Sequence, residues 1–217
     1  MRLLTFRVDG AGRTGVLRPD GSNEVVELDG AGDMLDLIDA GPEGLAHAAR
    51  TLASARSRSH RLQDVEVLAP LPNPRGNVIA IGRNYQAHAE ESARDIQFGW
   101  GGQFFKGKSL DGFCPIGPWI VTPDEIEDPQ SLRLSLRVNG VVKQDGNTRD
   151  MIYTVDAVIE WVSKGMTLLA GAIIATGTPD GVGFARTPPE FLKSGDVMEA
   201  EVERIGTLRN RIVSAAG

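Results

Sequence analysis

A histidine and a carboxylate that could activate water lie three residues apart in the run GRNYQAHAEE, residues 82–91. If residues 84–91 are helical, His88 and Glu91 share one face. A carboxylate beside an imidazole orients the ring and raises its basicity, which suits a general base. The same spacing occurs in ordinary surface pairs, so spacing alone leaves both interpretations open.

A glycine-rich stretch further along the chain contains two lysines in its second half. Residues 98–112, FGWGGQFFKGKSLDG, carry several glycines between aromatic residues. Such a segment loses much conformational entropy when it is ordered, so we predict a mobile lid. Lys106 and Lys108 at its edge could hold a substrate carboxylate or stabilise an oxyanion. The alternative is a pair of solvated lysines in a flexible loop.

A third candidate segment is TGTPDGVG, residues 176–183, which leaves a predicted buried strand. Exposed backbone N–H groups and hydroxyls in such a turn form an anion-binding concavity. The segment lacks the Lys-Ser/Thr ending of a phosphate-binding loop, which argues against a nucleotide site. A plain connecting turn is the alternative.

The elements that must position these segments are mostly strands. We predict strands over 78–81 and 172–175, and a hairpin in which alternating residues 132–138 lead into Asn139-Gly140. Residues 154–163 have helical periodicity, with Thr154 as a cap and Gly165 at the end. A half-exposed strand is expected over 198–203, where Glu199, Glu201 and Glu203 alternate with apolar residues.

The first part of the chain has a different character. Short strands are expected within 1–28, helices over 33–39 and 42–55, and a solvated loop over 54–61. Prolines 70, 72 and 74 then stiffen the chain. We therefore predict a β-dominated α+β fold, with a small N-terminal α+β unit at 1–70 and a main body at 71–217.

Composition limits the classes of function. The 217 residues are 41% apolar and 24% charged, with a net charge of −6, as in ordinary globular proteins. The negative charge disfavours nucleic acid and anionic membranes as partners. Cys114 is the single cysteine, and no run of about 18 apolar residues occurs. These features predict a soluble, cytoplasmic protein without intrachain disulfides or a membrane span.

Taken together and in this order, the segments resemble the fumarylacetoacetate hydrolase family. The resemblance runs from about Val65 to Ile212, and GRNYxxHAxE with TGTPxGVG is its most specific part. Further matching stretches are SARDIQ, GKSLDGFCPIGPWIV, LRLSLRVNGVVKQDGNTRDMIYTV, GMTLLAGAIIATGTPDGVG and LKSGDVMEAEVERIGTLRNRI. The resemblance implies a C-terminal domain of mixed β-sheets wrapped into a roll, a homodimer, bound Mg²⁺ or Mn²⁺, and a small 2-oxo acid as substrate.

The resemblance also implies roles for individual residues. The implied catalytic residues are His88, Glu91 and Lys108. The implied substrate-binding residues are Arg83, Tyr85, Arg94, Gln97 and Thr178. Within these sets His88 and Glu91 activate water, Gln97 and Lys108 contact substrate oxygens, and Thr178 contacts a carboxylate.

The chain departs from the family pattern at the metal site. The family carries several dozen residues between NYxxHAxES and ARDxQ, including a metal-binding Glu-x-Glu pair, and here the two landmarks run together near 91–93. Glu90 stands where a metal-binding aspartate would be and is a weak candidate ligand. Glu199 and Glu201 look like a substitute pair, but their strand makes them a solvated face. Either an internal segment of the polypeptide is missing from this chain, or the chain is a deletion variant that holds a hard cation poorly.

Three functions follow from the resemblance. The first is metal-dependent hydrolysis of a C–C bond in an acid of the acylpyruvate or fumarylpyruvate type, as in aromatic catabolism. The second is decarboxylation or isomerisation of an oxaloacetate-type 2-oxo acid at the same site. The third is a non-catalytic binding or dimerisation module that has lost its metal site.

Overall fold

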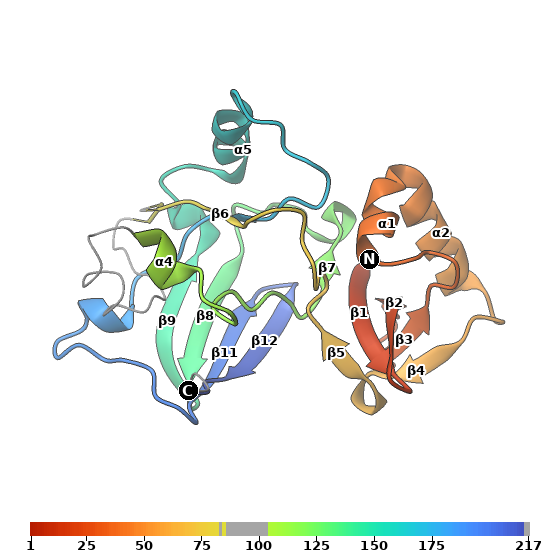
Figure 1. Cartoon of the computed structure of the whole chain (residues 1–217), viewed down its shortest axis with the longest axis horizontal. Helices are drawn as coiled ribbons and strands as arrows, with labels where there is room; N and C mark the ends of the chain where they lie inside the picture. Colours follow the sequence, from red (N-terminus) through yellow and green to blue (C-terminus); the bar gives the residue numbers. More distant parts are fainter. Residues whose placement is uncertain (83, 86–103, 215–217) are drawn as a thin grey trace.

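The computed structural model describes residues 1–82, 84–85 and 104–214, and it contains two sheet-bearing parts (Figure 1). The first part contains β1 (Arg2–Val8), β2 (Ala11–Leu17), β3 (Glu24–Glu27), α1 (Met34–Asp39), α2 (Gly41–Ala53), β4 (Ser59–Arg61) and β5 (Glu66–Leu68). The second contains β6 (Ile79–Ala80), α4 (Phe104–Lys108), β7 (Ile120–Val121), β8 (Arg133–Val138), β9 (Val141–Asn147), α5 (Val155–Ser163), β10 (Ile174–Ala175), β11 (Val197–Val202) and β12 (Gly206–Arg211). Short 3-10 turns connect several of them, including η4 (Gly183–Ala185). The predicted β-dominated α+β class is confirmed.

The N-terminal sheet buries both of its faces. Its strand order is β4-β3-β2-β1-β5, with antiparallel pairing throughout. Since side chains alternate along a strand, Leu3 and Val16 lie in the cluster packed with α1 and α2. Leu4 and Phe6 lie in a second cluster, together with partly buried Leu62, Val65 and Trp119. This unit therefore holds most of the fully buried apolar side chains in the described part of the chain.

The two predicted helices of this unit are confirmed, and their start has a clear cause. The Asp33 carboxylate accepts bonds from the backbone N–H groups of Leu35 (2.8 Å) and Asp36 (3.0 Å). The Asp36 carboxylate in turn accepts from the Asp33 N–H, which completes a capping box. Gly41, the first residue of α2, has a φ of +53° and so lets the chain turn after α1.

The prediction of a solvated loop over 54–61 is partly wrong, because Ser59–Arg61 forms the edge strand β4. The reason lies in a buried carboxylate that sequence alone did not place. Glu27 is 3% exposed, and its oxygens lie 3.2 Å from His60 Nε2 and 3.7 Å from Arg58 Nη1. Arg13 Nη1 lies 3.0 Å from the same carboxylate. His60 in β4 and Arg58 just before it therefore lie against an internal carboxylate instead of forming a free loop.

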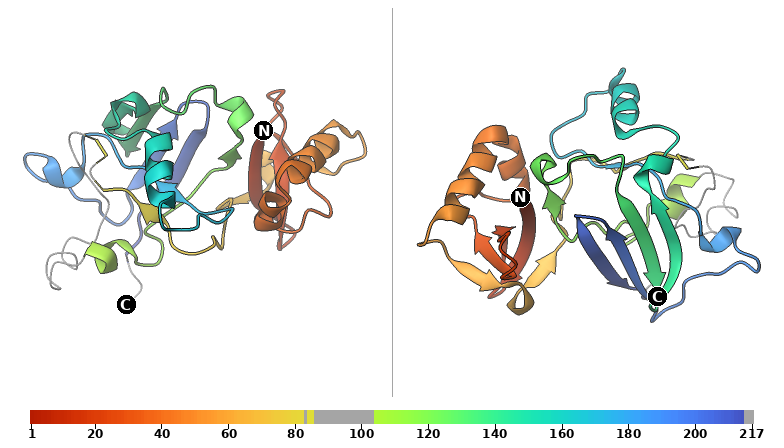
Figure 2. Two further views of the ribbon diagram at one scale, coloured as in Figure 1. Left: turned by 90° about the horizontal axis from the view of Figure 1, so that it is seen from above. Right: turned by 180° about the vertical axis from the view of Figure 1, so that it is seen from behind.

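Strand β7, from the second part of the chain, pairs with β1 of the first, with Ile120 opposite Leu3. Next to it, Trp119 packs on the N-terminal core and donates from Nε1 to the Ile205 carbonyl (2.5 Å). The two parts lie side by side in all views (Figure 2). Because the β1–β7 pairing crosses the predicted boundary at residue 70, the division into 1–70 and 71–217 stays a prediction.

The second part is built on an antiparallel sheet of order β12-β11-β8-β9. The β8–β9 hairpin turns at Asn139 (φ +51°) and Gly140 (φ +78°), as predicted, since both residues tolerate positive φ. Helix α5 begins after Thr154, whose side chain accepts from the Ala157 N–H (3.2 Å), which confirms the predicted cap. A separate parallel pair, β6 with β10, completes the part.

Strands β6 and β10 are shorter and less buried than the predicted strands over 78–81 and 172–175. Each has two residues, and Ala80 and Ala175 are exposed. Within the described residues each pairs only with the other, so no wider sheet covers them. In the same described ranges, no helix has the length and hydropathy needed to cross a membrane.

Candidate active site

Two of the predicted motifs leave neighbouring parallel strands at the same edge. Ile79 lies opposite Ile174 and Ala80 opposite Ala175 in the β6–β10 pair. The Ile81 N–H donates to the Ala175 carbonyl (2.9 Å), which continues the pairing past both strands. Because the strands are parallel, the segment that begins at Gly82 and the turn that begins at Thr176 leave the strand pair at the same end. Active-site residues often lie on such segments at strand ends.

Asn84 fastens these two segments to a third one. Its side chain is 1% exposed, and Nδ2 donates to the carbonyls of Thr176 (2.8 Å) and Tyr153 (3.0 Å). Its Oδ1 accepts from the Tyr153 N–H (2.7 Å), and its own carbonyl accepts from the Ile152 N–H (2.8 Å). One buried amide thus holds the strand end after β6, the turn after β10 and the segment that leads into α5.

Tyr85, a predicted substrate-binding residue, packs directly against the turn after β10. Gly177 has a φ of +120°, and a Cβ there would lie 3.0 Å from the Asn84 Cβ and 3.4 Å from the Tyr85 ring. Tyr85 is 3% exposed, and its hydroxyl has no hydrogen-bond partner among the described residues. Burial, with a smaller contribution from the charge of Asp150, raises the pKa of Tyr85 above 10. The phenol therefore stays protonated and can donate a hydrogen bond.

Thr178 lies in the turn that β9 supports. The Gln144 Nε2 atom lies 3.0 Å from Thr178 Oγ1 and 2.6 Å from the Pro179 carbonyl oxygen. Pro179 is buried against Gly146, where a Cβ would come within 2.7 Å of the Pro179 Cβ. Gly181, with a φ of +103°, leaves no room for a side chain, since a Cβ would lie 2.1 Å from the Lys143 carbonyl. The turn therefore has a fixed position on the strand.

Arg186, which lies outside the predicted motifs, holds the end of this turn near Gly181. Arg186 donates to the carbonyls of Lys143 (2.5 Å) and Gly181 (3.0 Å) from Nη2. Lys143 Nζ lies 2.5 Å from Glu190 Oε1, and this hydrogen bond, followed by the charges of Lys143 and Arg186, lowers the pKa of Glu190. These bonds tie the end of the TGTPDGVG segment to β9. They are structural in kind, because they use backbone carbonyls and a surface carboxylate.

Lys108 is the last residue of helix α4, so residues 104–108 of the predicted lid are helical. The side chain is half-buried, and burial lowers the pKa of Lys108 from its ordinary value of 10.5. Helix α4 lies on the side of the second part that faces away from the N-terminal unit, as does η4 (Figures 1 and 2). A partly desolvated ammonium is suited to hold an anionic group.

Six of the predicted site residues lie outside the residues that the structure describes. They are Arg83, His88, Glu90, Glu91, Arg94 and Gln97. Their roles and their distances to Tyr85, Lys108 and Thr178 stay predictions.

The described residues do not fit a metal centre. No group of three or more His, Cys, Asp or Glu side chains in the described ranges could hold an ion. Glu199 lies 3.3 Å from Arg209 Nε and Glu201 lies 3.0 Å from Arg137 Nη1, so both carboxylates form surface ion pairs. This arrangement agrees with the expectation that the Glu199–Glu201 pair is a solvated face.

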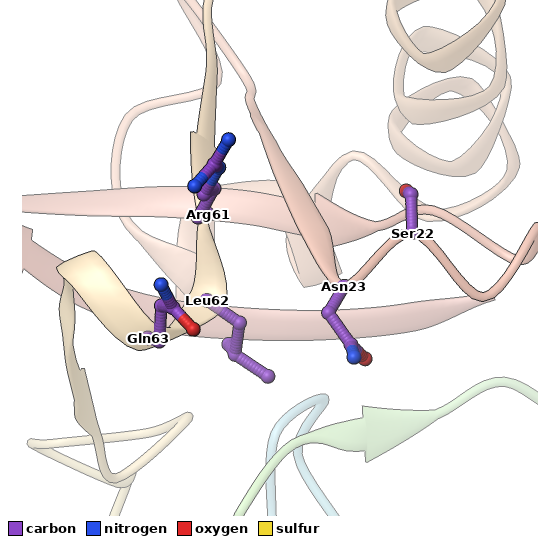
Figure 3. A pocket seen from close by; sticks show the side chains of 5 residues that line it. All are labelled: Ser22, Asn23, Arg61, Leu62 and Gln63. Carbon is purple, nitrogen blue, oxygen red and sulfur yellow. The ribbon is translucent and has the colours of Figure 1, made fainter.

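A surface depression of about 500 Å³ lies elsewhere, in the N-terminal unit (Figure 3). Its lining comes from the loop before β3 and from the β4 end, and consists of Ser22, Asn23, Arg61, Leu62 and Gln63. No buried polar side chain points into it, since four of these residues are exposed and the fifth is leucine. We therefore do not assign it to the candidate site.

Comparisons with known proteins point to one family. Residues 85–213 match the family model described as fumarylacetoacetate (FAA) hydrolase C-terminal. The chain is 33% identical to oxaloacetate tautomerase YisK of Bacillus subtilis (strain 168), over 83% of this chain and 86% of that protein. It is 44% identical to the mitochondrial oxaloacetate tautomerase Fahd2a of Rattus norvegicus, over 63% of this chain but only 44% of that protein.

Two solved structures share the fold over nearly the whole chain. Fumarylacetoacetate hydrolase from psychrophilic Exiguobacterium antarcticum has a TM-score of 0.84 at 30% identity and covers 99% of both chains. Maleylpyruvate hydrolase from Sphingobium sp. SYK-6, in complex with manganese(II) ion and pyruvate, has a TM-score of 0.73 at 25% identity and covers 98% of this chain and 99% of that one.

The comparison with the Bacillus subtilis protein also bears on the shortened spacing. That alignment runs over 260 positions, whereas this chain has 217 residues. The relative therefore carries residues inside the matched region that have no counterpart here. This finding agrees with the departure seen near residues 91–93.

Proposed function

Because the chain belongs to the fumarylacetoacetate hydrolase family, we propose that it binds a small 2-oxo acid and catalyses a reaction that passes through the enolate of that acid. The observation that carries this proposal is the convergence of two family motifs at the β6–β10 edge. There Asn84 joins the segment of Tyr85 to the turn of Thr178. Hydroxyl donors such as those of Tyr85 and Thr178 can recognise a carboxylate and its neighbouring oxygen.

We assign the candidate residues different roles in this reaction, including those that lie outside the described part of the chain. The Thr178 hydroxyl donates to the substrate carboxylate, and the Lys108 ammonium supports the negative charge that develops on the 2-oxo oxygen. Tyr85, buried and protonated, offers a further donor beside the turn. Arg83, Arg94 and Gln97 assist substrate binding. His88, oriented by Glu91, acts as the general base.

Tautomerisation of an oxaloacetate-type acid is the first candidate reaction. Both relatives described above are oxaloacetate tautomerases, and the Bacillus subtilis protein matches 83% of this chain. In this reaction a base removes a proton from the carbon next to the 2-oxo group and the oxygen gains a proton. No bond between carbon atoms breaks, and no water is consumed.

Hydrolysis of a C–C bond is the second candidate, favoured by the likeness to maleylpyruvate hydrolase. Here His88 deprotonates a water that attacks a distal carbonyl, and the electrons of the broken bond pass to the enolate. Decarboxylation needs the same enolate support but no attacking water. Activity that survives loss of the His88–Glu91 pair would favour decarboxylation.

A substrate screen tests the proposed function. Oxaloacetate should show faster keto–enol conversion by ultraviolet absorbance, or acylpyruvates should release pyruvate, each with Mg²⁺ or Mn²⁺ present. The His88→Ala variant should be about 10²–10⁴-fold slower if His88 is the general base. Wild-type protein that converts neither class of acid would contradict the proposal, and equal turnover in His88→Ala would remove that role.

Use of Mg²⁺ or Mn²⁺ is a proposal that draws on the manganese-bound relative. When bound, a divalent ion supplies Lewis-acid stabilisation of developing negative charge. The described residues offer no such site, so its ligands must come from elsewhere, with Glu90 the weak candidate in this chain. Metal analysis of the purified protein, and its melting temperature with and without added ion, test this point.

A non-catalytic binding or dimerisation module is the rival from another class. The specific observation in its favour is the internal region that the Bacillus subtilis relative has and this chain lacks. Three results together would identify such a module. The purified protein would hold no ion, added ion would not change its melting temperature, and it would convert no 2-oxo acid. The homodimer, testable by light scattering, and a cytoplasmic location also remain proposals.

A further inference from the structure

We propose that Gln144 is a positioning residue that makes the Thr178 hydroxyl a hydrogen-bond donor for the substrate carboxylate. The inference rests on the proposed function, since it concerns how the same site recognises a 2-oxo acid. Its basis is the pair of contacts that the Gln144 amide makes with the turn after β10.

The chemistry of Pro179 fixes which way the Gln144 amide points. The Pro179 carbonyl oxygen lies 2.6 Å from Nε2 and can only accept a hydrogen bond. The amide nitrogen, and not the amide oxygen, must therefore face it. The same nitrogen lies 3.0 Å from Thr178 Oγ1. An amide nitrogen carries two hydrogens, so one is directed to each partner.

This arrangement fixes the direction of the Thr178 hydrogen bond. The hydroxyl oxygen accepts from Gln144, and its single hydrogen remains to be donated. Among the described residues no acceptor for that hydrogen is found, and Thr178 is only half-buried. An ionised carboxylate only accepts hydrogen bonds, so it is the natural partner. With the amide reversed, Thr178 would donate to Gln144 and have no hydrogen left for the substrate.

The surrounding structure keeps the amide in this orientation. Pro179 is buried over Gly146, where even a methyl group would come within 2.7 Å of the Pro179 ring. Arg186 binds the carbonyls of both Lys143 and Gly181, which holds this turn against the strand that carries Gln144. A fixed donor direction costs no reorganisation when the substrate binds.

Pyruvate binding to the full chain, measured by calorimetry in buffer with Mn²⁺, tests the role of Gln144. The Gln144→Met variant keeps the side-chain length and removes the amide, so we expect affinity to fall about tenfold. Thr178→Val should cause a similar loss, while Thr178→Ser should bind almost as well as wild type. Asp145→Asn is the matched control, because Asp145 is exposed on the same strand and pairs with Arg133.

A double variant separates action through Thr178 from a general effect. If Gln144 acts through that hydroxyl, Gln144→Met should cause no further loss in the Thr178→Val background. If Gln144→Met fails to fold, Gln144→Glu is the second test. It keeps the shape, but its carboxylate would take the Thr178 hydrogen, and pyruvate affinity should again fall.

The possible outcomes distinguish this inference from the proposed function. Wild-type protein that binds no pyruvate would overturn the proposed function and this inference with it. Wild-type protein that binds pyruvate, with unchanged affinity in Gln144→Met, would overturn only the role of Gln144. Independent, additive losses in the double variant would show that Gln144 does not act through Thr178.

Discussion

At the scale of single residues, the protonation of Lys108 sets an expected pH dependence. Burial lowers the pKa of Lys108 from 10.5, so the ammonium loses its proton at a lower pH than an exposed lysine. If the charged form binds substrate, kcat/KM should fall on the alkaline side at a pH below 10.5. Kinetics across the alkaline range measure this fall.

Lys108→Arg provides the matching control for that pH dependence. A guanidinium stays charged across the whole range, so the alkaline fall should disappear or move to higher pH, even if the maximal rate is lower. An identical alkaline fall in Lys108→Arg would show that another group is responsible. Wild-type kinetics in Lys108→Met would remove the lysine from the site altogether.

Candidate catalytic and substrate-binding residues could be predicted from the sequence better than the residues that position them. Tyr85, Lys108 and Thr178 were named because their motifs resemble a family. The supporting roles of Gln144 and Arg186 are not predicted from the sequence. Gln144 bonds to Thr178, 34 residues away, and Arg186 bonds to Lys143, 43 residues away, and no local pattern reveals such contacts. Asn84 lies inside a recognised motif, yet its bonds reach 69 and 92 residues along the chain.

At the scale of elements, the two-residue strands β6 and β10 hold the site only with help from Asn84. In Asn84→Ala, the carbonyls of Thr176 and Tyr153 and the Tyr153 N–H would lose the partner that the buried amide supplies. Each hydrogen bond contributes about 0.5–1.5 kcal/mol to stability. We expect a loss of about 2–3 kcal/mol in the free energy of unfolding, measured by urea denaturation.

The control for Asn84 is Asn147→Ala. Asn147, the last residue of β9, accepts a single bond from the Arg149 N–H (3.0 Å) at the start of a short 3-10 turn. Its loss should cost about 1 kcal/mol. Equal stabilities of Asn84→Ala and Asn147→Ala would contradict the view that Asn84 holds the three segments together.

Elements with strong local signals were predicted, and elements defined by distant partners were not. Helical periodicity and the Thr154 cap located α5, and the Asn-Gly pair located the β8–β9 turn. Strand β4 is predicted as a loop, because His60 within it and Arg58 just before it lie against Glu27, a carboxylate that is buried only in the folded sheet. Strand β7 went unrecognised for a related reason, since its two residues are strand only where β1 pairs with them.

At the scale of the whole molecule, apolar side chains are distributed unevenly. Most large apolar side chains that remain exposed in the described ranges lie beyond residue 104, among them Phe105 (68% exposed) and Trp161 (75%). The N-terminal unit, by contrast, has a dense core. Large exposed apolar surface usually marks a contact with another part of the protein or with a partner. This pattern agrees with an internal region that the relative has and this chain lacks.

The junction near residues 91–93 can be tested directly in protein isolated from its native cells. Trypsin cleaves after Arg83 and Arg94, so a contiguous chain gives the peptide NYQAHAEESAR. We expect mass spectrometry to find that peptide absent, because the predicted missing segment lies near residues 91–93, inside it. Detection of the peptide would show that the chain is a true deletion variant, and would strengthen the rival without a metal site.

Deuterium exchange into pyruvate tests the proposed enolate most directly, whichever reaction follows it. In D₂O with Mg²⁺ or Mn²⁺, the protein should speed the loss of the pyruvate methyl signal in proton NMR, in proportion to protein concentration. Thr178→Val and His88→Ala should reduce that rate. Exchange no faster than in protein-free buffer with the same ion, for both pyruvate and oxaloacetate, would contradict the account.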